Sequence, residues 1–217
     1  MNLVLLSTMD KTSNIENMQK VFNELTLINP PEKTSIGYLS YHTDSELTRF
    51  NITKERYSQL GYSKFKCFVM DSELNINTIE EVLNCNLIHI PGGNTFDLLN
   101  LLRKHQLIDK LRLFAKKGGT LVGVSAGGIC ITPNISVASF ADSNDINITD
   151  FNSLNLVSFI VKPHWQYWND KADLFEKLNK LNNIPIYTLE DGEAIIVKNN
   201  VIKPFIDSYR NNTLISI

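Results

Sequence analysis

Short apolar runs alternate along the chain with segments whose apolar residues recur at helical spacing. The apolar runs predict strands at residues 2–6, 35–39, 65–70, 86–90 and 120–124. The spaced segments predict helices at residues 14–25, 54–60, 77–83, 96–103 and 108–117. This alternation is typical of parallel βαβ units. We therefore expect an α/β fold with an open, mostly parallel sheet that helices cover on both faces.

Beyond Ser139, apolar runs and helical segments alternate less regularly. The pattern predicts further strands at residues 156–161, 185–189, 194–197 and 201–205, and a helix at residues 170–181. At a prior of roughly 150 residues per domain, a chain of 217 residues is expected to form one domain, residues 1–217.

The composition is that of an ordinary globular protein. With 43% hydrophobic residues, 20% charged residues and a net charge of −2, nothing favours nucleic acid or an anionic membrane as a partner. No apolar run approaches the roughly 20 residues of a membrane span, and the first residues do not resemble a signal peptide. Cys67, Cys85 and Cys130 lie in or beside apolar runs without C-x-x-C spacing, which predicts reduced core residues and a cytoplasmic protein.

The stretch G-V-S-A-G, residues 123–127, has the form G-x-S-x-G. Small residues two before and two after Ser125 allow a strand to turn abruptly into a helix, with the serine exposed at the apex. The backbone N–H of Ala126, at the start of that helix, can stabilise a developing oxyanion. Ser125 is thus a candidate nucleophile, and the alternatives are a phosphate-binding glycine loop or a plain tight turn.

A second glycine turn, P-G-G-N-T at residues 91–95, also follows a predicted strand and begins a helix. Ligands in open α/β sheets lie beyond the carboxyl ends of the strands. Gly92, Gly93 and Asn94 are therefore candidate oxyanion or substrate-binding residues, with the Gly93 N–H as a second oxyanion donor. The chain has neither a P-loop ending nor G-x-G-x-x-G, which makes nucleotide binding a weak interpretation.

A hydroxyl nucleophile needs a general base within hydrogen-bond reach. His164, in V-K-P-H-W-Q-Y-W, follows a predicted strand and is the best-placed of the four histidines. His89 lies inside an apolar strand and is expected in the core, whereas His42 and His105 lie in polar segments.

A carboxylate must then orient the imidazole. Asp142 and Asp145 are the nearest candidates in sequence, and an acidic cluster in L-E-D-G-E provides further ones: Glu190, Asp191 and Glu193.

Three motifs together resemble the aspartyl dipeptidase, or peptidase E, family of serine peptidases. They are P-G-G-N-T-F-D-L-L at residues 91–99, G-V-S-A-G-G at 123–128 with T-P-N-I at 132–135, and L-N-L-V-S-F-I-V-K-P-H at 154–164. The motifs occur in the family's order and at similar spacing. The resemblance extends over nearly the whole chain.

The resemblance implies a flavodoxin-like, three-layer fold similar to that of class I glutamine amidotransferases. It implies Ser125 as nucleophile, His164 as base and oxyanion N–H groups from Gly93 and Ala126, with Asp142 near the position of the family's acidic residue. We expect hydrolysis of short peptides through an acyl-enzyme, with no metal or cofactor, and a possible homodimer. An esterase or amidase using the same site, or a non-catalytic binding protein retaining the fold, are the alternatives.

One departure from the family pattern concerns specificity. The aspartyl-specific members recognise the acidic side chain of the substrate with an arginine that follows the active-site histidine. The corresponding stretch here, W-Q-Y-W-N-D-K-A-D, contains no arginine, and Lys171 is its only cation. Since lysine lacks the bidentate fork of arginine, a strict preference for N-terminal aspartate is not predicted.

Overall fold

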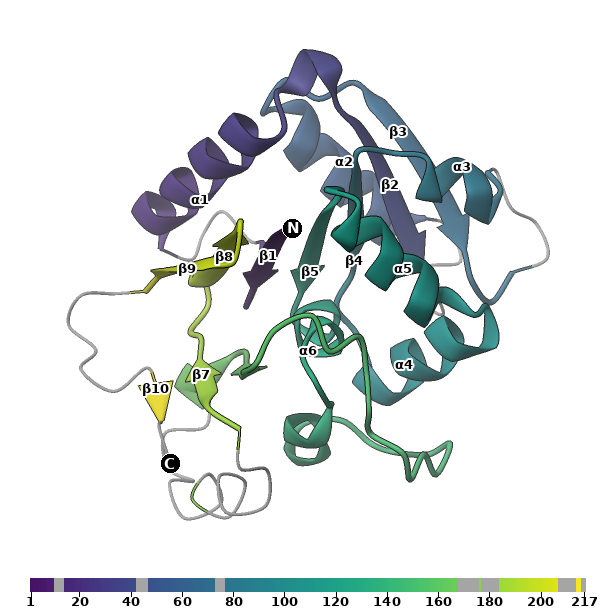
Figure 1. The fold of residues 1–217 in the computed structure, drawn as a ribbon, viewed down its shortest axis with the longest axis vertical. Helices are drawn as coiled ribbons and strands as arrows, with labels where there is room; N and C mark the ends of the chain where they lie inside the picture. The colour runs from purple at the N-terminus through teal and green to yellow at the C-terminus, as the bar shows by residue number, and fades with distance from the viewer. Residues whose placement is uncertain are drawn as a thin grey trace.

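The computed structural model describes residues 1–9, 14–41, 47–72, 77–167, 176, 184–206 and 214–215. Within this part of the chain a seven-stranded sheet has the strand order β3-β2-β4-β5-β1-β8-β9 (Figure 1). Its strands are β1 (Asn2–Leu6), β2 (Ser35–Ser40), β3 (Lys64–Val69), β4 (Leu87–Ile90), β5 (Thr120–Val124), β8 (Ala194–Lys198) and β9 (Val201–Phe205). The pairs from β3 to β1 are parallel, whereas β8 and β9 are antiparallel to their neighbours.

Helices cover both faces of this sheet, as β1 makes clear. Leu3 and Leu5 belong to one buried cluster, with side chains from α3, α4, α5 and α6. Val4 and Leu6 belong to the opposite cluster, with side chains from α1 and α2. The alternation of side chains along a strand therefore divides the core into two layers. The bounds are α1 (Ile15–Ile28), α2 (Thr48–Ser58), α3 (Ile79–Leu83), α4 (Thr95–Lys104), α5 (Leu107–Lys116) and α6 (Ala126–Ile131).

A small second sheet lies beside the main one. It has the order β10-β7-β6, from β6 (Ile160–Lys162), β7 (Ile186–Thr188) and β10 (Leu214–Ile215). Strands β6 and β7 are parallel, with Lys162 opposite Thr188, so that their carboxyl ends lie at the same edge. The segments that follow these two ends carry His164 and the acidic L-E-D-G-E stretch.

The predicted α/β architecture with a mostly parallel central sheet is confirmed. The strand predicted at residues 156–161 is wrong over residues 156–159, because β6 begins at Ile160. The reason is a competing backbone contact, because the Leu156 N–H donates to the Ile131 carbonyl at the end of α6 rather than to a neighbouring strand.

The helix predicted from residue 54 begins at Thr48. Ile15, one of the apolar residues at helical spacing in α1, is 71% exposed. The helix predicted at residues 170–181 falls almost wholly outside the described residues, and so does Lys171. None of the helices among the described residues has the length and apolar character needed to cross a membrane.

Candidate active site

Ser125 occupies a sharp turn between β5 and α6. Its φ of 50° and ψ of −112° lie in a region that L-residues seldom adopt. The Ser125 N–H donates to the Leu6 carbonyl of β1 at 2.9 Å, and the Ser125 carbonyl accepts from the Ile129 N–H at 3.0 Å. These bonds hold the serine at the carboxyl end of the sheet, where it is only partly buried. This is the geometry of a nucleophile elbow.

The small residues around Ser125 are required by packing. A Cβ on Gly123 would lie 2.5 Å from the Gly127 carbonyl oxygen, and a Cβ on Gly127 would lie 2.1 Å from the Ile90 carbonyl oxygen. Both distances are far below van der Waals contact. The expectation that small residues permit this turn is confirmed, because the turn packs directly on the end of β4.

His164 faces Ser125. The Ser125 Oγ and the His164 Nε2 are 2.9 Å apart, although the two residues are 39 positions apart along the chain. The residue has a positive φ of 58°. Its side chain is 37% exposed, so solvent reaches the imidazole. The structure therefore brings together the two residues that the sequence proposed as nucleophile and base.

The carboxylate at the other side of the imidazole belongs to Asp191. Its Oδ1 is 2.6 Å from His164 Nδ1, and its side chain is 20% exposed. The contact follows from the small sheet, because His164 comes just after β6 and Asp191 just after β7, the parallel neighbour. With the proton on Nδ1 donated to Asp191, Nε2 is left to accept from the Ser125 hydroxyl.

Asp142, the residue expected to orient His164, lies elsewhere. Its Oδ2 accepts from the Thr95 backbone N–H at 2.8 Å and from Thr95 Oγ1 at 2.5 Å. Asp142 thus satisfies donors in the first turn of α4, where a carboxylate is favoured by the unpaired N–H groups and the helix dipole. The prediction of a contact between Asp142 and His164 is corrected in favour of Asp191.

The other acidic candidates have local partners. Asp145 accepts from the Ser143 hydroxyl at 3.0 Å, and Glu193 accepts from the Glu190 N–H at 2.7 Å within the turn that carries Asp191.

The glycine turn after β4 lies directly beside Ser125. A Cβ on Gly92 would lie 3.2 Å from Ser125 Cβ and 3.8 Å from Ser125 Oγ. Gly93 has φ of +135°, and a Cβ there would collide with the Tyr41 hydroxyl, so position 93 demands glycine. The Asn94 side chain caps α4, accepting from two backbone N–H groups, and its amide donates to the Ser143 carbonyl. Asn94 therefore shapes the turn.

Two residues of this region were not singled out from the sequence. Ser7 is fully buried, donates to Asp191 Oδ1 at 3.1 Å and accepts from the His164 N–H at 2.9 Å. Gln166 accepts from the Asp191 N–H at 3.2 Å. The signal available for Ser7 was its place directly after β1, a strand whose carboxyl end lies beside that of β5.

His89 and His105, the other histidines in the described part of the chain, do not compete for the role of base. His89 is buried against Tyr38 and within 3.1 Å of the Tyr57 hydroxyl, as expected of a core residue, and burial lowers its pKa to about 3. His105 is partly buried against the Met70 carbonyl, and the predicted exposed position of His42 lies outside the described residues.

The cysteines do not supply an alternative nucleophile. All three cysteines are buried and none forms a disulfide, and burial raises the pKa of Cys130, on α6, to about 12, which keeps it a thiol. Among the described residues, no group of three or more His, Cys, Asp or Glu side chains is arranged to hold a metal ion.

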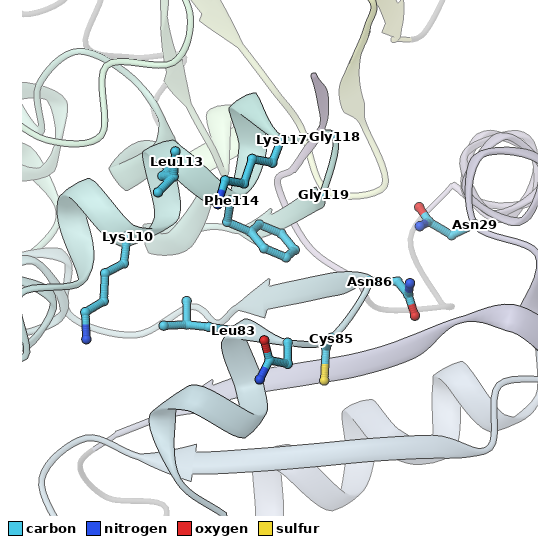
Figure 2. Close-up of a pocket in the computed structure, with 11 residues that line it drawn as sticks. Asn29, Leu83, Cys85, Asn86, Lys110, Leu113, Phe114, Lys117, Gly118 and Gly119 are labelled. Atoms are coloured by element: carbon cyan, nitrogen blue, oxygen red, sulfur yellow. The ribbon is translucent and has the colours of Figure 1, made fainter.

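A cavity of about 580 Å³ opens at the opposite end of the sheet (Figure 2). Residues preceding β4 and β5, among them Asn86, Gly118 and Gly119, line it. It contains none of the residues that the sequence proposed for chemistry, and Ser125 lies at the other end of β5.

Comparison with known proteins identifies the family. The profile of peptidase family S51 matches residues 3–204 of the chain. The protein belongs to peptidase family S51. This S51 peptidase is therefore a hydrolase of the serine peptidase type, and the resemblance to the peptidase E family is confirmed.

Individual relatives agree with this assignment. An uncharacterized peptidase of Pasteurella multocida is 27% identical over 176 residues, which cover 77% of this S51 peptidase and 83% of the relative. A peptidase E of Shewanella denitrificans is 40% identical over 81 residues, covering 36% of this chain and 32% of that protein. A crystal structure of a candidate peptidase E protein from Listeria monocytogenes superposes with a TM-score of 0.72 and 23% identity, covering 94% of this chain and 96% of that one. The shared fold is flavodoxin-like.

Proposed function

We propose that this serine peptidase hydrolyses short peptides through an acyl-enzyme on Ser125, with His164 as general base and Asp191 as its orienting carboxylate. The observation that carries the proposal is the continuous line of contacts from Ser125 Oγ to His164 Nε2 at 2.9 Å and from His164 Nδ1 to Asp191 Oδ1 at 2.6 Å. A serine, a histidine and a carboxylate joined in this order are the parts of a hydroxyl-nucleophile triad.

The steps follow from this geometry. His164 Nε2 takes the hydroxyl proton while Ser125 Oγ forms a bond to the peptide carbonyl carbon. The carbonyl oxygen becomes an oxyanion, for which the N–H groups of Gly93 and Ala126 are the proposed donors. The C–N bond then breaks as the imidazolium returns its proton to the leaving amine. A water molecule, deprotonated by His164, attacks the ester and releases the acid.

Asp191 acts through His164. As an acceptor from Nδ1–H, it favours the tautomer whose Nε2 lone pair faces Ser125, and it stabilises the imidazolium that forms. His164 and Asp191 lie side by side because they follow β6 and β7, which are parallel neighbours.

A substrate class follows from what surrounds the site. Of the stretch after His164, the described part is Trp165–Tyr167, which contains aromatic and amide side chains and no cation. Short peptides are the proposed substrates, and no described residue of this stretch supplies a cation to select N-terminal aspartate.

Hydrolysis of a dipeptide panel tests the proposal. The wild-type protein should cleave dipeptides, and Ser125→Ala and His164→Ala should each lower kcat by several powers of ten with the fold retained. A Ser125→Ala variant with full peptidase activity would contradict the assignment.

The same panel separates the alternatives. Simple esters and amides are included beside the dipeptides. Faster turnover of esters with little dipeptide cleavage would identify an esterase or amidase, whereas no turnover of any substrate would favour a non-catalytic protein with this fold.

A further inference from the structure

We propose that Ser7 is a positioning residue of the active site, which holds the base and its orienting carboxylate in register with Ser125. The inference rests on the proposed function and extends it to a residue outside the Ser125, His164 and Asp191 set. Ser7 follows β1 directly and its side chain is fully buried.

The Ser7 hydroxyl joins two parts of the site at once. It donates to Asp191 Oδ1 at 3.1 Å, the same oxygen that lies 2.6 Å from His164 Nδ1. It also accepts from the His164 backbone N–H at 2.9 Å. One hydroxyl therefore fixes both the carboxylate that orients the imidazole and the backbone that carries it.

The backbone contact matters because His164 has a positive φ of 58°. A residue other than glycine keeps such a conformation only where its surroundings hold it there. The hydrogen bond from its N–H to Ser7 Oγ is one such restraint. Without it, the imidazole can rotate away from Ser125 together with its backbone.

The place of Ser7 in the fold ties this restraint to the nucleophile. The carbonyl of Leu6, the preceding residue, accepts from the Ser125 N–H, and the Ser7 N–H donates to the Glu193 carbonyl in the turn that carries Asp191. The end of β1 thus contacts the serine turn, the histidine segment and the acidic turn. The side chains of Leu3–Leu6 in β1 pack in the two core layers, and the next residue, Ser7, places its hydroxyl at the site.

Removal of the hydroxyl tests the role. Ser7→Ala should lower kcat for dipeptide hydrolysis by about 10- to 100-fold, the range expected when a catalytic group is misplaced by about 1 Å, while KM changes less than about threefold. The rate at which a fluorophosphonate labels Ser125 should fall by the same factor. Ser7→Cys keeps the volume and offers only a weak donor, so it should show the same fall and serves if Ser7→Ala does not fold.

A matched control separates positioning from the loss of any buried hydroxyl. Ser153 is also buried, and its hydroxyl donates to the Cys130 carbonyl at 2.7 Å. Ser153→Ala removes the same atom from a different place and should leave kcat and the labelling rate within about threefold of wild type.

Coupling to His164 gives the decisive readout. If Ser7 acts by holding His164 and its carboxylate in place, adding Ser7→Ala to His164→Ala should change the labelling rate by less than about threefold, well below its effect in the wild type. Equal effects in both backgrounds, or an unchanged labelling rate in a folded Ser7→Ala protein, would overturn the inference. Absence of labelling in the wild type would instead overturn the proposed function.

Discussion

Two residues of the active site, Ser125 and His164, hold positive φ angles of 50° and 58°. Such conformations cost of order 1–3 kcal/mol each and persist where the surrounding structure holds them. The backbone bonds from Ser125 to Leu6 and from His164 to the Ser7 hydroxyl are the restraints seen here. At the scale of single residues, the fold therefore gives up local stability to bring the hydroxyl and the imidazole together.

The first prediction concerns Asp191, the carboxylate partner of His164. Asp191→Asn should lower kcat/KM by on the order of a thousandfold or more, because an amide stabilises neither the required tautomer nor the imidazolium. Steady-state kinetics on a dipeptide substrate measure it. Activity within tenfold of wild type would show that Asp191 does not orient the base.

Asp142 provides the matched comparison. Asp142→Asn weakens the contact with Thr95 and should cost about 1 kcal/mol of unfolding free energy, the usual value of a helix cap. Its kcat/KM should stay within about tenfold of wild type. Urea unfolding and kinetics on the same preparation check both values, and a loss of activity as large as that of Asp191→Asn would restore Asp142 as the orienting residue.

At the scale of elements, the serine turn is a packed junction of β4, β5 and α6. Gly127 lies so close to the end of β4 that a Cβ would stand 2.1 Å from the Ile90 carbonyl oxygen. A backbone atom cannot move aside without shifting the glycine turn that follows β4. Stability and activity therefore depend on the same contact.

Gly127→Ala should destabilise the protein by at least about 3 kcal/mol, at the upper end of the range for overpacking. Gly118→Ala is the control, since a Cβ there meets nothing within 4 Å and only the positive φ of +98° opposes it. Gly118→Ala should lower the free energy of unfolding by about 1–2 kcal/mol. Thermal and urea unfolding compare the two, and equal losses would contradict the packing account.

The elements also show how far the sequence predicts the site. Ser125 and His164 are found from local patterns, a G-x-S-x-G after an apolar run and a histidine after another. Asp191 cannot be identified from a local pattern as the partner of His164. Its contact with His164 depends on the parallel pairing of β6 with β7, which no local pattern specifies. Asp142 was favoured by its place in the chain after Ser125, whereas the fold uses it at the start of α4. The central strands were predicted well, since buried parallel strands are continuous apolar runs.

At the scale of the whole molecule, the central sheet carries a buried imidazole that does not take part in the chemistry. His89 on β4 is stacked on Tyr38 with ring centroids 5.0 Å apart, and burial, with a smaller contribution from Arg56, lowers its pKa from 6.5 to about 3. The unfolded chain binds a proton at this residue below about pH 6.5, and the folded protein does not until near pH 3. Acid therefore favours unfolding.

This difference predicts that His89 alone lowers the unfolding free energy by on the order of 3 kcal/mol between about pH 7 and about pH 4. His89→Gln cannot titrate, so the part of the pH dependence that His89 contributes should be missing from that variant. Urea unfolding at several pH values measures how the free energy of unfolding changes with pH in both proteins. The same change in both would show that His89 does not stay neutral in the folded state.

Peptide hydrolysis by the proposed mechanism requires an activated hydroxyl at Ser125, and covalent labelling tests for that hydroxyl most directly. Incubation with a fluorophosphonate, followed by intact-mass and peptide mass spectrometry, should add one phosphonyl group to the peptide that contains Ser125. The adduct should be absent from Ser125→Ala and should form far more slowly in His164→Ala. An unlabelled wild-type protein, or an adduct that persists in Ser125→Ala, would contradict the account.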